Sequence, residues 1–575
     1  MNDQPNFLVL LVDEERYPPI YETPEIKEWR KNHLTTHQYL KSHSVEFHRH
    51  YIGSTACCPS RATLFTGHYP SLHGVSQTDG IAKEAFDSDM FWLDRNTVPT
   101  MGDYFREAGY QTYYKGKWHI SNADITTPGT HKSIPSYHPW TGVPDRRLEE
   151  LYFQANRLED YGFSDWIGPD PVGKNPRNSA SSAAIGLSGR DEVYADESVK
   201  LIESLSRQKR AGHNMPPWLI VSSFVNPHDI VLYGDLTAQI PFFRFEVDPM
   251  PEIPPPPTIN EPLFTKPRCQ ASYRDVYPKA LQPISDGPFY RQFYYQLQKN
   301  ADQQMLKVVH ALTRSPFYDN TIVIFTSDHG DLLGAHGNLH QKFYCAYEEF
   351  LHVPFLIHNK HLFPHSKHMD TLTSHVDLIP TMLGLANIDA AEIQRRLQPR
   401  FSDAHPLVGR NLTPLIFGQH DYKIADEPIY FMTEDDVTRG QHQVNPLGEP
   451  YSSVIQPNHI ETVLMTFPSN NSKQLWKFSR YFDNKQFWSH PAKQDVTCQP
   501  VGNDPAEQWE MNVKTEPVPD EYELYNLTDD PLETCNLAHP SVATLHSRNV
   551  QEWMMKILEQ QRAQKRLYPT PYTIK

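Results

Sequence analysis

Four short apolar runs, each followed at once by polar residues, constrain the fold of this chain more than any other feature. They are residues 6–12 (NFLVLLV), 110–114 (YQTYY), 218–225 (WLIVSSFV) and 321–326 (TIVIFT). Continuously apolar runs of this length are typical of strands buried on both faces, as in parallel sheets. Because amphipathic stretches separate them, the pattern predicts an α/β fold with a mostly parallel sheet flanked by helices.

The residues directly after these runs are capable of chemistry. Open α/β sheets place their sites just beyond the carboxyl ends of the strands. Packing alone does not explain four strands that all end in carboxylates, lysines or histidines, so we expect one shared site there. The residues concerned are Asp13 and Glu14, Lys117 and His119, His228, and Asp328 and His329.

The stretch CCPSRATLFTG at residues 57–67 predicts a helix that begins near Cys57. Pro59 suits the first turn of a helix, and Gly67 suits its end. Cys57 would then lie at a helix N-terminus, which favours anions, with Arg61 one turn on and able to reach the same anion. This arrangement suits a nucleophile that attacks a sulfate or phosphate ester. Taken alone, the stretch is explained equally well by a buried cysteine pair in a core helix.

Length, charge and cysteine content narrow the class of protein. A chain of 575 residues predicts a large core domain and at least one smaller one. The formal net charge of −16 argues against non-specific binding to nucleic acid or to anionic lipid. Of the six cysteines, Cys57 and Cys58 are adjacent and the other four are scattered, so they form neither a disulfide framework nor a CxxC zinc pair. The N-terminus has no basic segment or cleavage site, and its apolar run is too short for a membrane span, so we expect a cytoplasmic protein.

The domain organisation follows from changes in pattern along the chain. Residues 1–424 read as the α/β domain, with long excursions at about 122–192 and 240–290. Loops of this length are typical of lids or subunit contacts, which leaves a homo-oligomer open. From 425 to 575, alternating strands and a closing helix near 540–562 predict a smaller α+β domain with an antiparallel sheet. Within the first domain, Thr100 and Gly109 predict the two ends of a helix, and residues 374–385 predict another.

Two motifs in combination carry a resemblance to a known family. Cys57-x-Pro59-x-Arg61 is followed by Thr66-Gly67, and Gly-Lys-Trp-His stands at residues 116–119. Together they resemble the type I, formylglycine-dependent sulfatases of the alkaline phosphatase superfamily, and further matches extend nearly to the C-terminus. These are Pro227-His228, Asp328-His329-Gly330, Lys342, residues 347–355, Glu523-Leu524-Tyr525-Asn526-Leu527, Asp530-Pro531 and Glu533.

The resemblance implies an alkaline-phosphatase-like fold and a particular nucleophile. In these sulfatases a separate maturation enzyme oxidises the cysteine at the position of Cys57 to formylglycine, whose aldehyde becomes hydrated. One hydroxyl attacks sulfur and displaces the alcohol. The other hydroxyl then loses its proton, and sulfate is expelled as the aldehyde reforms. Lys117 and Lys342 would neutralise the anion. His119 is the candidate base, and His228, with Lys342, the candidate acid for the leaving alcohol.

The resemblance also implies a divalent metal ion. Asp13 and Asp328 offer hard oxygen ligands, which suit calcium, with manganese or magnesium as alternatives. His329 stands where several sulfatases carry asparagine, and histidine occurs in branches that include choline sulfatases and phosphonate monoester hydrolases. Glu14 replaces a second aspartate, and the residue formed from Cys57 would complete the shell. Read singly, Asp13 could cap a loop, and Asp328-His329 could form a turn.

The sequence therefore predicts an arylsulfatase-like hydrolase of small-molecule sulfate monoesters. A phosphonate monoester or phosphodiester hydrolase with the same nucleophile is the alternative. A non-catalytic anion-binding protein of the same fold is more remote, because it predicts the loss of at least one motif residue and all are present. We assign no role to His336 or His340, and we interpret Asp79 as part of a loop turn rather than as a substrate contact.

Overall fold

The computed structural model describes residues 4–571 except 173–174, 182–188, 286, 420–426, 439–442, 446, 470–471, 484–494, 499–510 and 515–517. The predicted domain boundary at 424–425 and part of the first excursion lie outside the described residues. Within the described parts of the chain, no helix is both long enough and apolar enough to cross a membrane.

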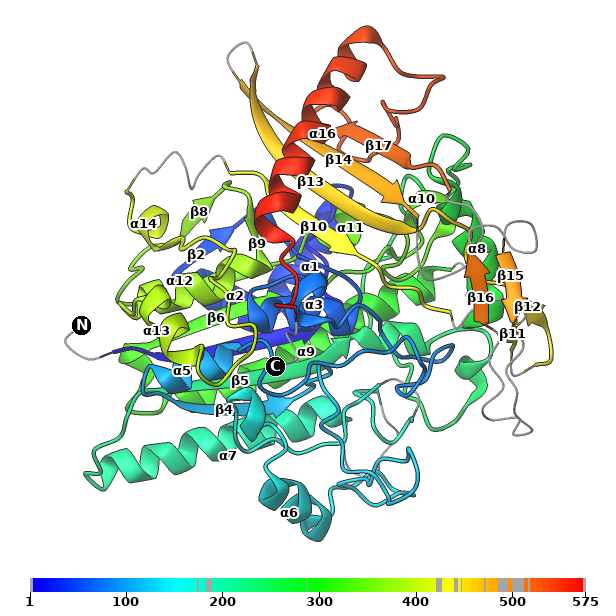
Figure 1. The fold of residues 1–575 in the computed structure, drawn as a ribbon. Coiled ribbons are helices and arrows are strands. Elements are labelled where there is room, and N and C mark those ends of the chain that lie inside the picture. The colour runs from blue at the N-terminus through cyan, green and yellow to red at the C-terminus, as the bar shows by residue number, and fades with distance from the viewer. Residues whose placement is uncertain are drawn as a thin grey trace.

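A seven-stranded sheet forms the centre of the molecule (Figure 1). Its strand order is β4-β5-β1-β6-β7-β2-β8, and every strand runs in the same direction except β7. All four predicted strands are present, and they are neighbours in the sheet, in the order β4-β5-β1-β6. The strands are β1 (Asn6–Asp13), β2 (Ser44–Phe47), β4 (Gln111–Gly116), β5 (Trp218–Pro227), β6 (Thr321–Ser327), β7 (Phe355–His358) and β8 (Lys367–Met369).

Helices cover both faces of this sheet. Alternate residues of β1 enter two separate apolar clusters, so Phe7, Val9 and Leu11 face one layer while Leu8 and Leu10 face the other. The first layer is built from α3 (Cys57–Thr66), α5 (Met101–Glu107), α12 (Leu378–Leu385) and α13 (Ala390–Leu397). The second is built from α2 (Thr35–Lys41), α7 (Arg190–Arg210) and α9 (Pro288–Thr313). This double cover explains why the strands read as continuous apolar runs.

The predicted helix ends at Thr100 and Gly67 are confirmed. Thr100 caps α5, and its side chain accepts from the backbone of Asp103 in a capping box. Gly67 ends α3 in the left-handed conformation, at φ 69°. Pro380 is tolerated because it falls in the first turn of α12, where a missing N–H breaks no helical hydrogen bond.

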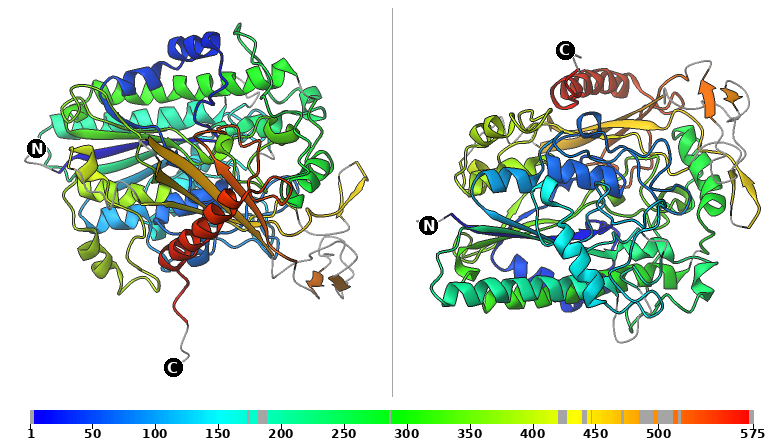
Figure 2. Two further views of the ribbon diagram at one scale, coloured as in Figure 1. Left: turned by 90° about the horizontal axis from the view of Figure 1, so that it is seen from above. Right: turned by 60° about the horizontal axis from the view of Figure 1, so that its bottom comes forward.

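The C-terminal part of the chain forms a separate four-stranded antiparallel sheet with a long helix across it (Figures 1 and 2). Its order is β10-β13-β14-β17, and the helix is α16 (Leu545–Lys565), as the sequence pattern predicts. The strands are β10 (Ile429–Thr433), β13 (His459–Ser469), β14 (Ser472–Phe482) and β17 (Glu521–Asn526). Two apolar clusters join this sheet to the α/β part, and the N–H of Met432 donates to the carbonyl of Gly53 at 3.1 Å.

The two long excursions contain helices that the sequence pattern did not predict. The first holds α6 (Arg146–Ala155), and the second holds α8 (Arg268–Ala280). The remaining elements are α1 (Pro24–His33), α4 (Pro70–His73), α10 (Ala335–Asn338), α11 (Glu348–Leu351), α14 (Thr413–Ile416), β3 (His50–Tyr51), β9 (Thr373–Ser374), β11 (Gln443–Val444), β12 (Pro450–Tyr451), β15 (Asp495–Cys498) and β16 (Met511–Lys514).

Candidate active site

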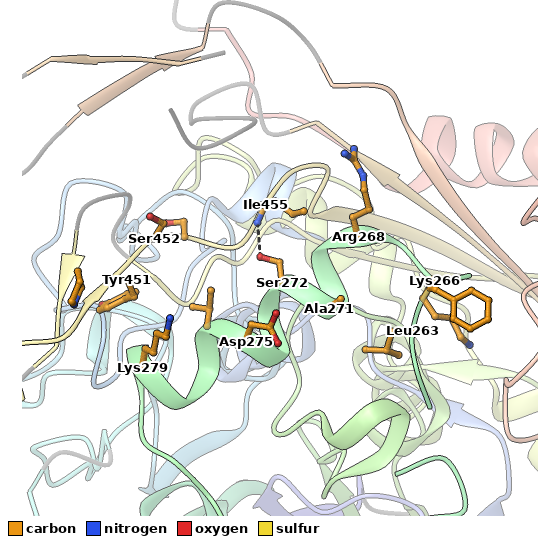
Figure 3. A pocket seen from close by; sticks show the side chains of 14 residues that line it. Leu263, Lys266, Arg268, Ala271, Ser272, Asp275, Lys279, Tyr451, Ser452 and Ile455 are labelled. Carbon is orange, nitrogen blue, oxygen red and sulfur yellow. Dashed lines mark hydrogen bonds between the residues drawn. The ribbon is translucent and has the colours of Figure 1, made fainter. Parts of the chain in front are cut away.

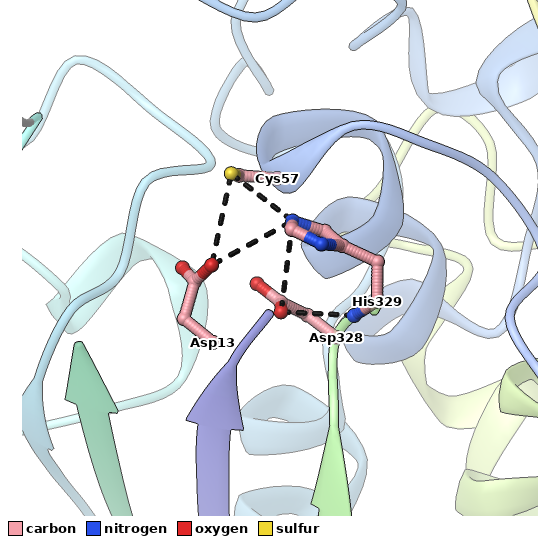
Figure 4. Close-up of side chains that lie close together, drawn as sticks. All are labelled: Asp13, Cys57, Asp328 and His329. Atoms are coloured by element: carbon pink, nitrogen blue, oxygen red, sulfur yellow. Dashed lines mark hydrogen bonds and ion pairs between the residues drawn. The ribbon is translucent and has the colours of Figure 1, made fainter. Parts of the chain in front are cut away.

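Two adjacent strand ends and one helix N-terminus meet at the carboxyl edge of the central sheet. Asp13 ends β1, Asp328 directly follows β6, and Cys57 opens α3 (Figure 4). β1 pairs with β6 in parallel, which brings the two carboxylates to the same level. All three side chains are buried, as the expectation of a shared site at this edge requires.

Four side chains converge there within the reach of one ion. The Sγ atom of Cys57 lies 3.2 Å from Nε2 of His329 and 3.8 Å from Oδ1 of Asp13. The same Nε2 lies 3.6 Å from Oδ1 of Asp13 and 3.7 Å from Oδ1 of Asp328. One ligand atom from each residue lies within 4.8 Å of the others. The structure thus brings together Asp13, Cys57, Asp328 and His329, which the sequence separates by up to 316 positions.

The imidazole of His329 is set up as a neutral ligand. Its Nδ1 atom lies 3.0 Å from the carbonyl of Gly330, which can only accept, so Nδ1 carries the hydrogen. The lone pair of Nε2 therefore faces the other three residues. Burial, followed by the positive charge of Lys342, holds the pKa of His329 well below its usual range. A neutral ring with a fixed tautomer is the form in which histidine binds metals.

The donor set fits a divalent cation. The two carboxylates supply oxygen ligands, which suit calcium, magnesium or manganese, and the imidazole adds one nitrogen ligand. Cys57 as a plain thiol fits less well, because burial and the charge of Asp13 raise its pKa well above the usual range. A thiol that stays protonated at neutral pH is neither a good ligand nor a good nucleophile.

Arg61 lies beneath the two carboxylates and holds them in place. Its Nε donates to Oδ2 of Asp328 at 2.7 Å, and Nη2 donates to Oδ2 of Asp13 at 3.1 Å. Its Nη1 donates to the carbonyl of Lys117 at 2.7 Å and to Oγ of Ser223 at 2.9 Å. These four donor contacts bind Arg61 to the protein itself, so its structural role is to orient Asp13 and Asp328. The predicted contact with a substrate anion stays a prediction.

Two buried lysines flank the cluster. Lys117 Nζ lies 2.7 Å from Oδ2 of Asp13, and Lys342 Nζ donates to Oε2 of Glu14 at 2.9 Å. Burial would raise the pKa of Asp13, but the positive charges of Lys117 and Arg61 oppose it, and the pKa lies well below the usual range. Asp13 is therefore ionised and ready to bind a cation.

Glu14 and His228 lie beside this cluster rather than in it. They form a second buried group with Asp13, in which the ligand atoms again lie within 4.8 Å. Burial raises the pKa of Glu14 well above its usual range, and Lys342 only partly opposes this. Burial and Lys117 lower the pKa of His228, which keeps its imidazole neutral. The metal role predicted for Glu14 and the acid role predicted for His228 stay predictions.

Comparison with known proteins identifies the family. The sulfatase family model matches residues 5–388. The chain belongs to the sulfatase family. YidJ, an uncharacterized sulfatase of Escherichia coli K12, is 27% identical over 398 residues, 68% of this chain and 69% of its own. The choline-sulfatase of Rhizobium meliloti is 24% identical over 402 residues, again 68% and 69% of the two chains.

A solved structure confirms the fold. The phosphonate monoester hydrolase of Agrobacterium radiobacter matches with a TM-score of 0.56 at 17% identity, over 98% of this chain and 96% of that one. The predicted alkaline-phosphatase-like architecture is thus confirmed. Membership of the sulfatase family makes the chain a hydrolase that acts on sulfate esters.

Three carboxylates to which the sequence analysis assigned no role contribute to the site of this sulfatase. Asp170 accepts from the backbone N–H of Trp118 and His119, and Asp79 contacts the His119 ring. Asp435, just beyond β10, accepts from the N–H of Ala56 at 2.9 Å. Each acts on a segment tens to hundreds of residues away, so no local motif marks it. Asp79 is not simply part of a turn, as the sequence suggested.

A cavity of about 770 Å³ lies elsewhere in the sulfatase, between α8 and residues 450–455 (Figure 3). Its lining includes Phe264, Ser272, Asp275 and Tyr451 but none of the residues of the candidate site. The chemistry of the side chains, rather than the size of a cavity, therefore locates the active site.

Proposed function

We propose that this sulfatase hydrolyses sulfate monoesters of the arylsulfatase type with a formylglycine derived from Cys57. The observation that carries the proposal is the position of the Cys57 Sγ atom, 3.2 Å from His329 and 3.8 Å from Asp13. Asp13, Asp328 and His329 would hold a divalent cation beside residue 57, and that cation would supply Lewis-acid chemistry there.

Oxidation of Cys57 to formylglycine would replace the buried thiol, which stays protonated and is a poor nucleophile. A hydrated aldehyde at residue 57 supplies two hydroxyls, one to attack sulfur and one whose proton loss releases sulfate. Calcium, or else manganese or magnesium, would supply a Lewis acid held by Asp13, Asp328 and His329. Because Cys57 is 2% exposed in the folded chain, its conversion requires a maturation enzyme that acts before this edge of the sheet closes.

The surrounding cations and histidines support the same chemistry. Lys117 and Lys342 are buried and positively charged, and together they suit the nonbridging oxygens of a sulfate ester. His119 and His228 are the candidate base and acid. Since burial and Lys117 keep His228 neutral, its ring N–H can donate a hydrogen bond to the leaving oxygen, and the charged Lys342 would supply the proton.

The direct test is the mass of the tryptic peptide that contains Cys57, measured on protein from the native host. We expect a mass about 18 Da lower than that of the cysteine peptide, together with turnover of nitrophenyl sulfate. A cysteine of unchanged mass in protein that turns over the ester would overturn the proposal. Co-expression with a formylglycine-generating enzyme is the control for a host that lacks the maturation step.

Phosphonate monoester hydrolysis is a second candidate, favoured by the histidine at position 329 within the ligand group. Tetrahedral sulfate and phosphonate esters present similar oxygens to Lys117 and Lys342. We expect nitrophenyl sulfate to give the higher kcat/KM of the two matched nitrophenyl esters. A higher value for the phenylphosphonate would move the assignment to the second candidate.

A further inference from the structure

The ring of His119 is held by a carboxylate. Nε2 of His119 lies 2.6 Å from Oδ1 of Asp79, and the two side chains are 3% and 2% exposed. Because a carboxylate at this distance accepts, Nε2 carries the hydrogen and Nδ1 keeps the lone pair. Nδ1 is buried, and it has no hydrogen-bond partner among the described residues. An unpartnered buried nitrogen is costly unless a bound molecule uses it.

The backbone of His119 is held by a second carboxylate. His119 has a φ of 57°, in the left-handed region that few residues other than glycine adopt. Asp170 stabilises this turn, because its two oxygens accept from the N–H groups of Trp118 at 2.7 Å and His119 at 2.9 Å. Gly116 precedes the turn at a φ of 100°, where a Cβ would lie 1.8 Å from the carbonyl oxygen of Ser223.

Asp79 interacts with the His119 imidazole, and the neighbouring Cys58 thiol stays neutral. Cys58, Asp79 and His119 form a buried group whose ligand atoms lie within 4.8 Å of one another. Burial and the charge of Asp79 raise the pKa of Cys58 well above its usual range. Cys58 therefore stays a neutral thiol, and the histidine is the partner that gains from the carboxylate when it takes up a proton.

We propose that Asp79 is a positioning residue that fixes the tautomer of His119 and leaves Nδ1 as the proton acceptor. The inference rests on the proposed function, in which His119 deprotonates the second hydroxyl of the hydrated residue 57. In that step the O–H bond breaks and an N–H bond forms at Nδ1. The resulting imidazolium is stabilised by the carboxylate of Asp79, and the proton then passes to water.

The same geometry gives the first long excursion a role in the site. Asp170 lies within residues 122–192, and it determines the direction in which the His119 side chain leaves the turn. Asp79 follows α4 in the chain, on the opposite side of the turn in sequence. Two segments with no catalytic motif of their own thus hold one candidate base at its backbone and at its ring.

The first experiment tests the tautomer and needs no activity. The protein is labelled with ¹⁵N-histidine, and the signal of His119 among the 29 histidines is assigned by its loss in His119→Gln. We expect the neutral ring to carry its hydrogen on Nε2 and to show the shift of an unprotonated nitrogen at Nδ1. A hydrogen on Nδ1 in the wild-type protein would overturn the proposal.

The second experiment measures Asp79→Asn on nitrophenyl sulfate under rapid mixing. We expect a burst of about one equivalent of nitrophenolate per site, then a steady-state kcat about 10²-fold below wild type with KM changed little. The burst arises because the first step does not need His119 as a base, whereas sulfate release does. A merely structural role for Asp79 predicts instead a loss of both phases or a raised KM.

The matched control is Asp89→Asn, which removes a carboxylate from the same loop. Asp89 pairs with Lys83 at 2.5 Å, whereas the carboxylate on the His119 ring, within the described part of the chain, is that of Asp79. Its kcat is expected within about 2-fold of wild type. If wild-type protein carrying formylglycine turns over no sulfate ester, the proposed function fails, while the ¹⁵N measurement still decides the tautomer. If wild type is active and Asp79→Asn matches it, the positioning role alone fails.

Discussion

Two buried histidines of this sulfatase lie among carboxylates, and they are used in opposite ways. His329 directs Nδ1 at the carbonyl of Gly330 and presents the lone pair of Nε2 to Asp13, Asp328 and Cys57. His336 pairs both nitrogens with carboxylates, Nδ1 with Glu261 at 3.0 Å and Nε2 with Glu349 at 3.3 Å. Its ring also stacks on Tyr347 at 3.5 Å between centroids.

The charge states follow from these partners. Burial and Lys342 keep the pKa of His329 well below its usual range. Burial alone would also lower the pKa of His336, but Glu349 and Glu261 outweigh it and raise that pKa to about 9. Proximity to carboxylates therefore does not by itself make a histidine a metal ligand. His329 differs from a structural imidazolium such as His336 because its ring is neutral and one of its nitrogens carries no hydrogen.

The largest effect is expected for His329→Ala. Removing the Nε2 lone pair takes one ligand from the cation, so kcat/KM for nitrophenyl sulfate should fall by about 10³-fold. Calcium bound per chain, measured by mass spectrometry of metals after desalting, should fall in parallel, while the melting temperature in the presence of chelator stays close to wild type. Full activity in the variant would contradict the ligand role.

The counterpart is His336→Gln, which should spare the chemistry and weaken the fold. It leaves the buried Glu349 without its imidazolium, whereas Glu261 keeps Lys266 at 3.2 Å, and the free energy of unfolding should drop by about 3 kcal/mol. Denaturant unfolding gives the stability, and kcat per folded molecule gives the activity. A loss of activity without a loss of stability would make the two histidines alike and undo the comparison.

The pH dependence of stability offers a milder test. The pKa of His336 is about 9 in the folded chain against an ordinary 6.5, so its ion pairs stabilise the fold fully below pH 6.5 and less as pH rises through 9. The raised pKa corresponds to about 3 kcal/mol. Because His37 has a similarly raised pKa, the measured quantity is the difference between wild type and His336→Gln, which should shrink between pH 6.5 and 9. A constant difference would mean that His336 is neutral.

The smallest effect is expected for Glu261→Gln. Glu261 is the more exposed of the two partners of His336, and Glu349 remains as a counter-charge after the change. We expect a loss of about 1 kcal/mol in unfolding free energy and unchanged kcat. A loss as large as that of His336→Gln would show that Glu261 alone keeps the ring protonated.

The sequence predicted the central strands of this molecule better than the residues that position the site. The strands β1, β5 and β6 could be predicted because helices cover both of their faces and every position is buried, whereas the edge strand β4 is partly exposed. The helix α8 was missed, because its buried positions are filled largely by tyrosine, glutamine and cysteine and read as irregular. Asp170 and Asp435 were missed, and Asp79 was interpreted as part of a turn, because all three act on backbone or ring atoms that are distant in the sequence.

The place of β1 in the sheet has a consequence for the newly made chain. The first strand to be synthesised lies between β5 and β6, whose first residues are Trp218 and Thr321. Until the ribosome has passed those residues, β1 has no permanent neighbours and the edge that buries Cys57 does not exist. Synthesis of more than 250 residues separates the appearance of Cys57 from its enclosure. Under the proposed function, that interval is the time in which a modifying enzyme can reach a side chain that the finished protein buries.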